Sequence, residues 1–267
     1  MEKLIRVIAR NLIFVLRGKG LGLIDKLRLK LKGRYTPMSV KINGTKFLLS
    51  DAASFVAMYE ELFIKQIYAF NSDKKDPLII DCGANIGLGI ASYKRVYPNA
   101  RVIAFEPDNG IFEMLKSNVE AAGYSHVEIV KKAIWISNEP LKFVSDGGLS
   151  GRLDEGASGE RVITVEAQRL KEILNQPVDL LKIDIEGAEH SVIKDCADSF
   201  GQVKLLFVEY HSDINEPQHL QDILEIITKA GFRYHIQEAY VNQQPFLGIK
   251  PMLHMDLQLN IFAYRSN

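Results

Sequence analysis

The alternation of short apolar segments with amphipathic segments after Pro77 is the sequence feature that most constrains the fold. Strand-like apolar segments lie at 78–82, 101–106, 127–131, 179–184 and 204–209. Helical periodicity occupies roughly 87–97, 109–122, 168–175, 187–197 and 217–230. Strands that alternate with helices are typical of a parallel sheet covered by helices. We therefore predict an α/β fold with a mostly parallel sheet.

The C-terminal part breaks this alternation. The stretches "GFRYHIQEAYV" and "LQLNIFAYR" both have strand character, with only a loop between them. Two strands joined without a helix pair antiparallel or are separated by an inserted strand. Upstream, the Gly-rich stretch 145–160 lies inside an irregular pair of strands at 141–166. We expect it to be either a lid, with Ser150 and Arg152 reaching a substrate, or a surface hairpin.

Residues 1–76 differ from the rest in pattern and charge. Residues 1–34 contain ten Lys and Arg against two acids, although the whole chain has 33 of each sign. Helical spacing at 2–17, 22–32 and 51–70 surrounds Asn43-Gly44, a strong hairpin signal. We predict an N-terminal basic helical arm, hairpin and cap helix over 1–76, and a second domain over 77–267.

The basic amphipathic stretch 2–17 has two interpretations. It packs on the sheet domain or in a homodimer interface, or it lies on an anionic membrane surface. The first is favoured, because packed amphipathic helices are common.

The amino-acid composition argues against several classes of protein. The balanced global charge gives no case for a nucleic-acid binder. Cys82 and Cys196, without Cys-x-x-Cys or Cys/His spacing, suggest neither a disulfide framework nor a zinc site. No apolar run is long enough to span a bilayer, and no signal cleavage site follows the N-terminus. We expect a cytoplasmic protein, with peripheral attachment to the inner membrane face as the alternative.

A glycine-rich turn follows the strand at 78–82. In "LIIDCGANIGLGI", Gly83, Gly87 and Gly89 have the spacing GxxxGxG, so the dinucleotide fingerprint GxGxxG is absent. Asp81, at the end of the strand, would repel a pyrophosphate and attract a cationic ligand. The turn therefore argues against a nicotinamide cofactor.

An acid follows the next strand, in "VIAFEPD". Glu106 stands where a carboxylate can accept both hydroxyls of a ribose. A ligand with a ribose, an adenine and a positive centre but no phosphates fits these features. We predict S-adenosylmethionine as the cofactor.

Further ionisable residues follow the strands in "DLLKIDIEGAEHSVI" and "LFVEYH". Because the carboxyl ends of parallel strands meet at one edge, Asp81, Glu106, Asp184 and Glu209 should gather there. A histidine or a carboxylate of raised pKa at such an edge can act as a general base that removes a proton from an acceptor. We favour His211 and Asp184 for this step, with Glu186 and Glu209 in support.

Structural roles remain the alternative for several of these residues. Glu189 and His190 could be solvated helix residues, Glu186 could stabilise a helix N-terminus, and His211 could be an ordinary loop histidine. A divalent metal such as Mg²⁺, held by Asp184 and Glu209, could instead polarise the acceptor. No Asp-Asn or Asp-Asp pair stands beside Asp184 or Glu209 to support the metal, so none is favoured.

The motifs "DCGANIGLGI", "AFEPD", "DLLKIDIEGAEHSVI" and "LFVEYH", in this order, resemble the FkbM-type S-adenosylmethionine-dependent methyltransferases over about residues 42–264. The resemblance implies a Rossmann-like seven-stranded sheet with an antiparallel last strand. It also implies O-methylation of a sugar, glycan, lipid-linked saccharide or polyketide hydroxyl.

The resemblance also implies positions for the cofactor, with Asn109 flanking the ribose. The implied cofactor residues are Asp81, Gly83, Asn85 and Gly87 on the methionine side, Glu106, Pro107 and Asp108 around the ribose, Lys132 and Ala133 at the adenine, and Asp184. The rival interpretations are a non-catalytic adenosyl-binding module and a nicotinamide oxidoreductase.

Overall fold

A seven-stranded sheet forms the centre of the protein. The computed structural model describes residues 21–144, 152–153, 162–252 and 254–265. The strand order is β13-β14-β12-β11-β3-β4-β5. These strands are β3 (Leu78–Cys82), β4 (Arg101–Phe105), β5 (Val127–Val130), β11 (Val178–Ile183), β12 (Val203–Asp213), β13 (Arg233–Tyr240) and β14 (Met255–Tyr264). The last strand, β14, pairs antiparallel with both β12 and β13, which confirms the predicted fold class.

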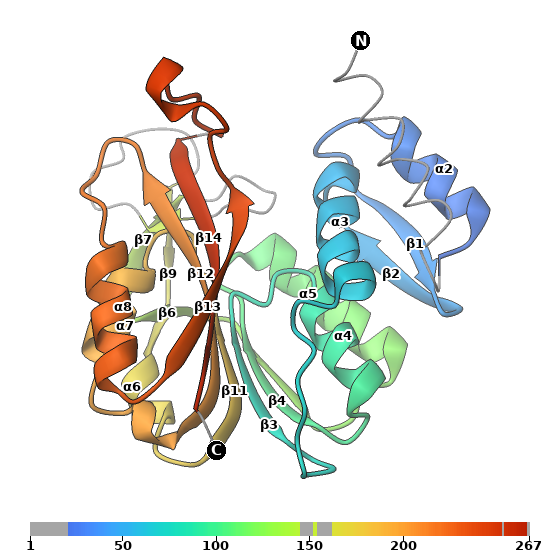
Figure 1. Ribbon diagram of the computed structural model, residues 1–267. Coiled ribbons are helices and arrows are strands. Elements are labelled where there is room, and N and C mark those ends of the chain that lie inside the picture. The colour runs from blue at the N-terminus through green and yellow to red at the C-terminus, as the bar shows by residue number, and fades with distance from the viewer. Residues whose placement is uncertain (1–20, 145–151, 154–161, 253, 266–267) are drawn as a thin grey trace.

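Helices cover both faces of the sheet (Figure 1). Helices α4 (Leu88–Val96) and α5 (Asn109–Ala122) lie on one side, and α6 (Leu170–Ile173), α7 (Glu189–Asp195) and α8 (Leu220–Lys229) lie on the other. Successive strand residues point to opposite faces, so Ile79 packs in the cluster with Ile90 and Leu115, while Ile80 packs in the cluster with Val192. This explains why the strands are apolar throughout.

The strand order reverses at β3, which lies between β4 and β11. The chain runs outward from β3 through β4 to β5, then crosses to β11 on the other side. Crevices that hold ligands form outside the carboxyl ends of strands at such a point. The fold therefore places the end of β3 beside the end of β11.

Strand β12 is longer than predicted, because β14 pairs with it from Leu205 to Asp213. Glu209 is therefore inside the strand rather than at its end, and His211 lies opposite Gln258. The alternative interpretation of His211 as a loop histidine was wrong.

The N-terminal part contains α2 (Leu23–Leu31), the hairpin β1 (Met38–Ile42) and β2 (Thr45–Leu49), α3 (Ala52–Tyr59) and a π-helix (Glu60–Lys65). The predicted hairpin turn is confirmed, with φ of 50° at Asn43 and 88° at Gly44. Asp51 accepts the Ser54 N–H and so caps α3. The predicted helix at 2–17 lies outside the described residues, and the domain boundary after residue 76 stays a prediction.

Asn118 joins the hairpin to the glycine-rich turn. Its buried side chain accepts a hydrogen bond from Leu48 N–H and donates to the carbonyl oxygens of Leu48 and Ile86. Because Ile86 belongs to the turn after β3, this residue fixes the N-terminal part against the edge where ligands are expected.

Short strands lie beside the main sheet. β6 (Ala133–Trp135) pairs with β10 (Ala167–Arg169), and β7 (Leu141–Val144) pairs with β8 (Arg152–Leu153) and β9 (Val162–Val165). The sequence did not predict β6 and β10, because three residues are too few to show a period. Most of the predicted lid at 145–160, including Ser150, lies outside the described residues.

Candidate active site

A cavity of about 690 Å³ lies at the carboxyl ends of the central strands. Nine predicted cofactor residues line it: Asp81, Gly83, Asn85, Glu106, Pro107, Asp108, Lys132, Ala133 and Asp184. The cavity lining also includes the predicted catalytic residues Glu186 and Glu209. Gly87 and His211 are not part of the lining.

Gly83 and Gly87 serve different purposes in the glycine-rich turn. Gly83 has φ of 87°, and a Cβ there would lie 2.0 Å from the carbonyl oxygen of Asp184, so only glycine lets the β3 and β11 ends meet. Gly87 also has positive φ, but its added Cβ would meet Leu115 at 2.8 Å, inside the core. Gly83 shapes the cavity, whereas Gly87 allows α4 to start close to α5.

Glu106 is buried at the cavity wall and held by two backbone groups. Its carboxylate accepts hydrogen bonds from Asn85 N–H at 3.0 Å and Asp108 N–H at 2.9 Å. Burial is the largest influence on its pKa and raises it to about 7. Each oxygen retains a further acceptor position, so the fixed carboxylate can receive a pair of hydroxyls. Asp108 itself accepts Ile111 N–H and caps α5.

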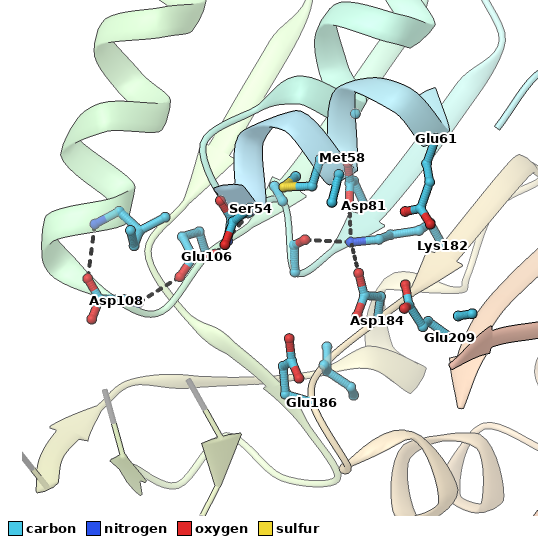
Figure 2. Close-up of a pocket in the computed structure, with 18 of the residues that line it drawn as sticks. Ser54, Met58, Glu61, Asp81, Glu106, Asp108, Lys182, Asp184, Glu186 and Glu209 are labelled. Atoms are coloured by element: carbon cyan, nitrogen blue, oxygen red, sulfur yellow. Dashed lines mark hydrogen bonds and ion pairs between the residues drawn. The ribbon is translucent and has the colours of Figure 1, made fainter. Parts of the chain in front are cut away.

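Lys182 is a central residue that the sequence interpretation missed. Its Nζ atom lies 3.1 Å from Asp81 Oδ1 and 3.3 Å from Asp184 Oδ2, as Figure 2 shows. It also donates to the carbonyl oxygen of Cys82 at 3.2 Å. Burial acts to lower the Lys182 pKa, but the carboxylates of Asp184 and Asp81 outweigh it and raise the pKa.

The Lys182 pairing changes the role expected of Asp81. Lys182 compensates much of the charge of Asp81, so attraction of a cationic ligand depends on the neighbouring carboxylates as well. The expectation that Asp81 attracts a cationic ligand stays a prediction. Two carboxylates and one ammonium still leave a net negative charge, and Figure 2 places Glu61, Glu186 and Glu209 around them. The acidic cluster as a whole therefore favours a cationic ligand.

His211 and Glu189 form a buried pair next to this cluster. His211 Nδ1 lies 3.0 Å from Glu189 Oε1, and the side chains are 3% and 1% exposed. Glu189 also accepts the N–H groups of Ile185 and Gly187. The interpretation of Glu189 as a solvated helix residue was therefore wrong, because the turn after β11 folds it inward.

The other ring nitrogen of His211 faces the acidic cluster. Its Nε2 atom lies 3.6 Å from Glu186 Oε2 and 4.0 Å from Asp184 Oδ1, and 3.0 Å from the amide nitrogen of Gln258. Gln258 Nε2 also donates to Glu209 Oε1 at 2.5 Å. Gln258 could not be predicted as a site residue, since only the pairing of β12 with β14 brings it opposite His211.

Two influences act on the proton of His211. Donation from Gln258 favours a neutral ring, whereas the carboxylates of Glu189, Glu186 and Glu209 overcome the opposing effect of burial and raise the His211 pKa well above its usual range. The carboxylates act from several sides, whereas the amide can turn to present its oxygen. Their charges therefore favour the protonated ring.

Glu209 shares this environment. Burial first, and then the charge of Asp184, raise its pKa to about 8, while His211 opposes the shift. Asp184, Glu186 and His211 also place ligand atoms within 4.8 Å of one another, which could hold a divalent cation. That set differs from the predicted pair of Asp184 and Glu209.

Comparison with known proteins identifies the family. The model described as "Methyltransferase FkbM domain" matches residues 81–234, more than half of the chain. The chain belongs to the FkbM methyltransferase family. The predicted family and enzyme class are confirmed. Membership in a methyltransferase family argues against the alternative prediction of a nicotinamide oxidoreductase.

Several curated relatives are named as methyltransferases. Methyltransferase sdnD of Sordaria araneosa is 28% identical over 195 residues, covering 60% of this chain and 75% of that protein. 2-O-methyltransferase NoeI of Sinorhizobium fredii is 24% identical and covers 52% and 65%. Hexuronic acid methyltransferase AglP of Haloferax volcanii is 26% identical and covers 66% and 71%.

A solved FkbM methyltransferase from Methylobacillus flagellatus superposes with a TM-score of 0.48 at 14% identity, covering 98% of this chain and 60% of that one.

Proposed function

We propose that this FkbM-family protein transfers a methyl group from S-adenosylmethionine to a hydroxyl of a saccharide-containing acceptor. The observation that carries the proposal is the buried His211–Glu189 pair, whose second ring nitrogen, Nε2, faces Asp184 and Glu186 beside the cavity. An oxygen acceptor must lose a proton, and this arrangement supplies a base for it. The names of NoeI and AglP, a 2-O-methyltransferase and a hexuronic acid methyltransferase, support a sugar hydroxyl.

The residues of the cavity fit the cofactor. Gly83 lets the ends of β3 and β11 meet at the cavity, and Glu106 presents a fixed carboxylate suited to a ribose. The net negative cluster around Lys182 suits a ligand with a positive centre. When bound, S-adenosylmethionine supplies an electrophilic methyl group on a sulfonium.

Residues of the protein would then remove the proton of the acceptor hydroxyl. A cation near the acidic cluster lowers the pKa of His211, because it opposes the carboxylates that hold the imidazolium. The neutral ring then has a lone pair on Nε2, which would accept the proton of the acceptor in place of the Gln258 amide. Glu189 keeps the ring oriented through Nδ1 and stabilises the imidazolium that forms. His211 acts as the base in this proposal, with Asp184 and Glu186 directing the hydroxyl.

The remaining walls are available to the acceptor. Met58 and Glu61 come from the N-terminal helices. Tyr240 is the last residue of β13, and Met252 lies in the β13–β14 connection. Apolar and charged groups on these walls suit a molecule that is part sugar and part hydrocarbon. These residues come from segments far apart in sequence, so no motif marks them.

A titration tests the cofactor. S-adenosylmethionine and S-adenosylhomocysteine should bind in a calorimeter, whereas NAD should not. Glu106→Ala should weaken adenosyl binding, and Glu113→Ala, an exposed acid on α5, is the matched control.

Transfer of labelled methyl from the donor to saccharide and lipid-linked saccharide acceptors tests the reaction. The label should be found as an O-methyl ether. Binding without transfer to any hydroxyl acceptor would favour the non-catalytic module instead.

A further inference from the structure

Helix α2 turns its apolar stripe away from the protein. Leu23, Ile24, Leu27 and Leu31 are 62%, 73%, 50% and 88% exposed, while Lys26 and Leu29 are buried. These four residues lie within a stripe about 100° wide on the helix, at 3.6 residues per turn. A surface helix ordinarily turns such a stripe toward the core. This stripe therefore has no partner within the described part of the chain.

Cations border the stripe on both sides. On the same helical wheel, Arg28 lies about 40° beyond one edge and Lys30 about 20° beyond the other. Both are exposed, as are Lys32 and Arg34 just after the helix. Only one acid, Asp25, occurs between residues 21 and 36. An apolar face bordered by Lys and Arg is typical of a helix that lies in the surface of an anionic membrane.

A second apolar patch lies on the β13–β14 connection. Phe246 and Leu247 are 103% and 81% exposed, and Ile249 and Met252 are 43% and 40% exposed. Lys250 lies among them in the sequence. In Figure 1 the short red helix that carries Phe246 and Leu247 (Pro245–Leu247) lies at the same end of the molecule as α2. Two exposed apolar clusters at one end exceed the scattered exposure normal for a monomer.

Both patches adjoin the cavity wall. Arg34 and Tyr35 lie just after α2. Met252 belongs to the second patch, and Tyr240 lies before it in the sequence. All four residues line the cavity. A surface that binds both patches would therefore lie close to the acceptor side of the site.

We propose that α2 and residues 245–252 dock together on an anionic membrane surface, and that the acceptor is a saccharide held in that membrane by a lipid. The second clause rests on the proposed function, whereas docking does not. None of the helices that the structure describes could span a bilayer. A second copy is a poorer occupant, because a two-fold contact would bring the same cations against each other.

Vesicle flotation tests the docking. The full chain should float with phosphatidylcholine vesicles that contain phosphatidylglycerol, and much less with phosphatidylcholine alone. The double variant Leu27→Glu, Leu31→Glu should bind at least about tenfold more weakly, because it removes apolar contacts and adds like charge. Lys30→Glu should also weaken binding.

Matched controls separate docking from general surface effects. Val96→Glu replaces an apolar residue that is 50% exposed on α4, and Lys204→Glu removes an exposed cation at the start of β12. Neither should change flotation. Equal loss in the controls, or no flotation with either vesicle, would overturn the proposal.

Site labelling shows which surface meets the lipid. Cys82 and Cys196 are buried, so a polarity-sensitive dye can be attached at Leu27→Cys or Phe246→Cys. Both dyes should shift to the blue on anionic vesicles, and a dye at Val96→Cys should not. A blue shift without vesicles, or a dimer by light scattering, would mean that residues 1–20 or a second copy covers the surface, and would overturn the proposal.

The acceptor is tested separately. Methyl transfer to a polyprenyl-phosphate-linked saccharide in anionic vesicles should fall in the Leu27→Glu, Leu31→Glu variant, while S-adenosylmethionine binding stays unchanged. Equal transfer to the free saccharide would overturn the lipid-linked acceptor. Absence of transfer to any acceptor, with flotation intact, would instead count against the proposed function.

Discussion

Glu189 Oε1 lies 3.0 Å from Nδ1 of His211, across the junction of α7 and β12, with both side chains almost fully buried. Glu189 cannot turn away, because it also accepts two backbone N–H groups in the turn after β11. The pair therefore fixes which nitrogen of His211 faces the cavity.

Replacing Glu189 with Gln should lower kcat by about 10–100-fold, as loss of an orienting partner typically does. His211 would also lose its strongest stabilising charge, so the pH at which activity rises should fall. Measurement of kcat and KM against pH tests both effects, with Glu113→Gln as an exposed control. An unchanged pH profile would mean that Glu189 only supports the fold.

Binding of S-adenosylmethionine should release a proton at neutral pH. The neighbouring carboxylates raise the His211 pKa against the effect of burial, and a cationic ligand should lower it, so the ring should lose its proton on binding. Affinity should accordingly rise with pH. Calorimetry in buffers of different ionisation enthalpy measures the release, which should be smaller for the uncharged sulfur of S-adenosylhomocysteine. Equal release in a His211→Gln variant would assign the proton to another group.

Glu106→Gln should weaken S-adenosylmethionine binding by roughly 10–100-fold, since hydrogen bonds to a charged group contribute about 1.5–3 kcal/mol. The pKa of Glu106 is raised to about 7, so the wild-type carboxylate gains protons, and loses affinity, as the pH falls below 7. A titration series from acid to neutral pH should show this dependence in the wild type. The Glu106→Gln variant should lack the part of this pH dependence that comes from protonation of Glu106.

Lys182→Met should reduce the free energy of unfolding by about 3–5 kcal/mol, because Asp81 and Asp184 lose their shared partner, and Asp81 is buried. The exposed pair of Lys171 and Asp198 provides the control, and Lys171→Met should change stability by less than about 1 kcal/mol. Denaturant unfolding of both variants measures the difference. Equally small changes in the free energy of unfolding of the two variants would show that Lys182 and its carboxylate partners are solvated.

Chelation should leave methyl transfer unchanged if His211 is the base. The Asp184, Glu186 and His211 set could hold a divalent cation, but the proton on His211 and the ammonium of Lys182 compete for the same carboxylates. Activity after dialysis against EDTA, with and without added Mg²⁺, decides this. Loss that Mg²⁺ alone restores would assign the trio to a metal.

The sequence by itself determined the local structure and the edge where the site lies. Apolar strands alternate with helices, and Asn43-Gly44 turns the hairpin, because these patterns depend on neighbours along the chain. Gly83, Glu106 and Asp184 were placed at one edge because parallel strands all end on the same side.

Only the tertiary structure decided which charges meet. Lys182 neutralises Asp81 because β11 lies beside β3. Gln258 reaches His211 because pairing with β14 continues β12 to Asp213, four residues beyond the predicted end at residue 209. Helical periodicity indicates an apolar stripe on α2, but it does not predict that this stripe faces away from the protein. Burial and ion pairing depend on contacts between distant segments, whereas periodicity describes one segment at a time.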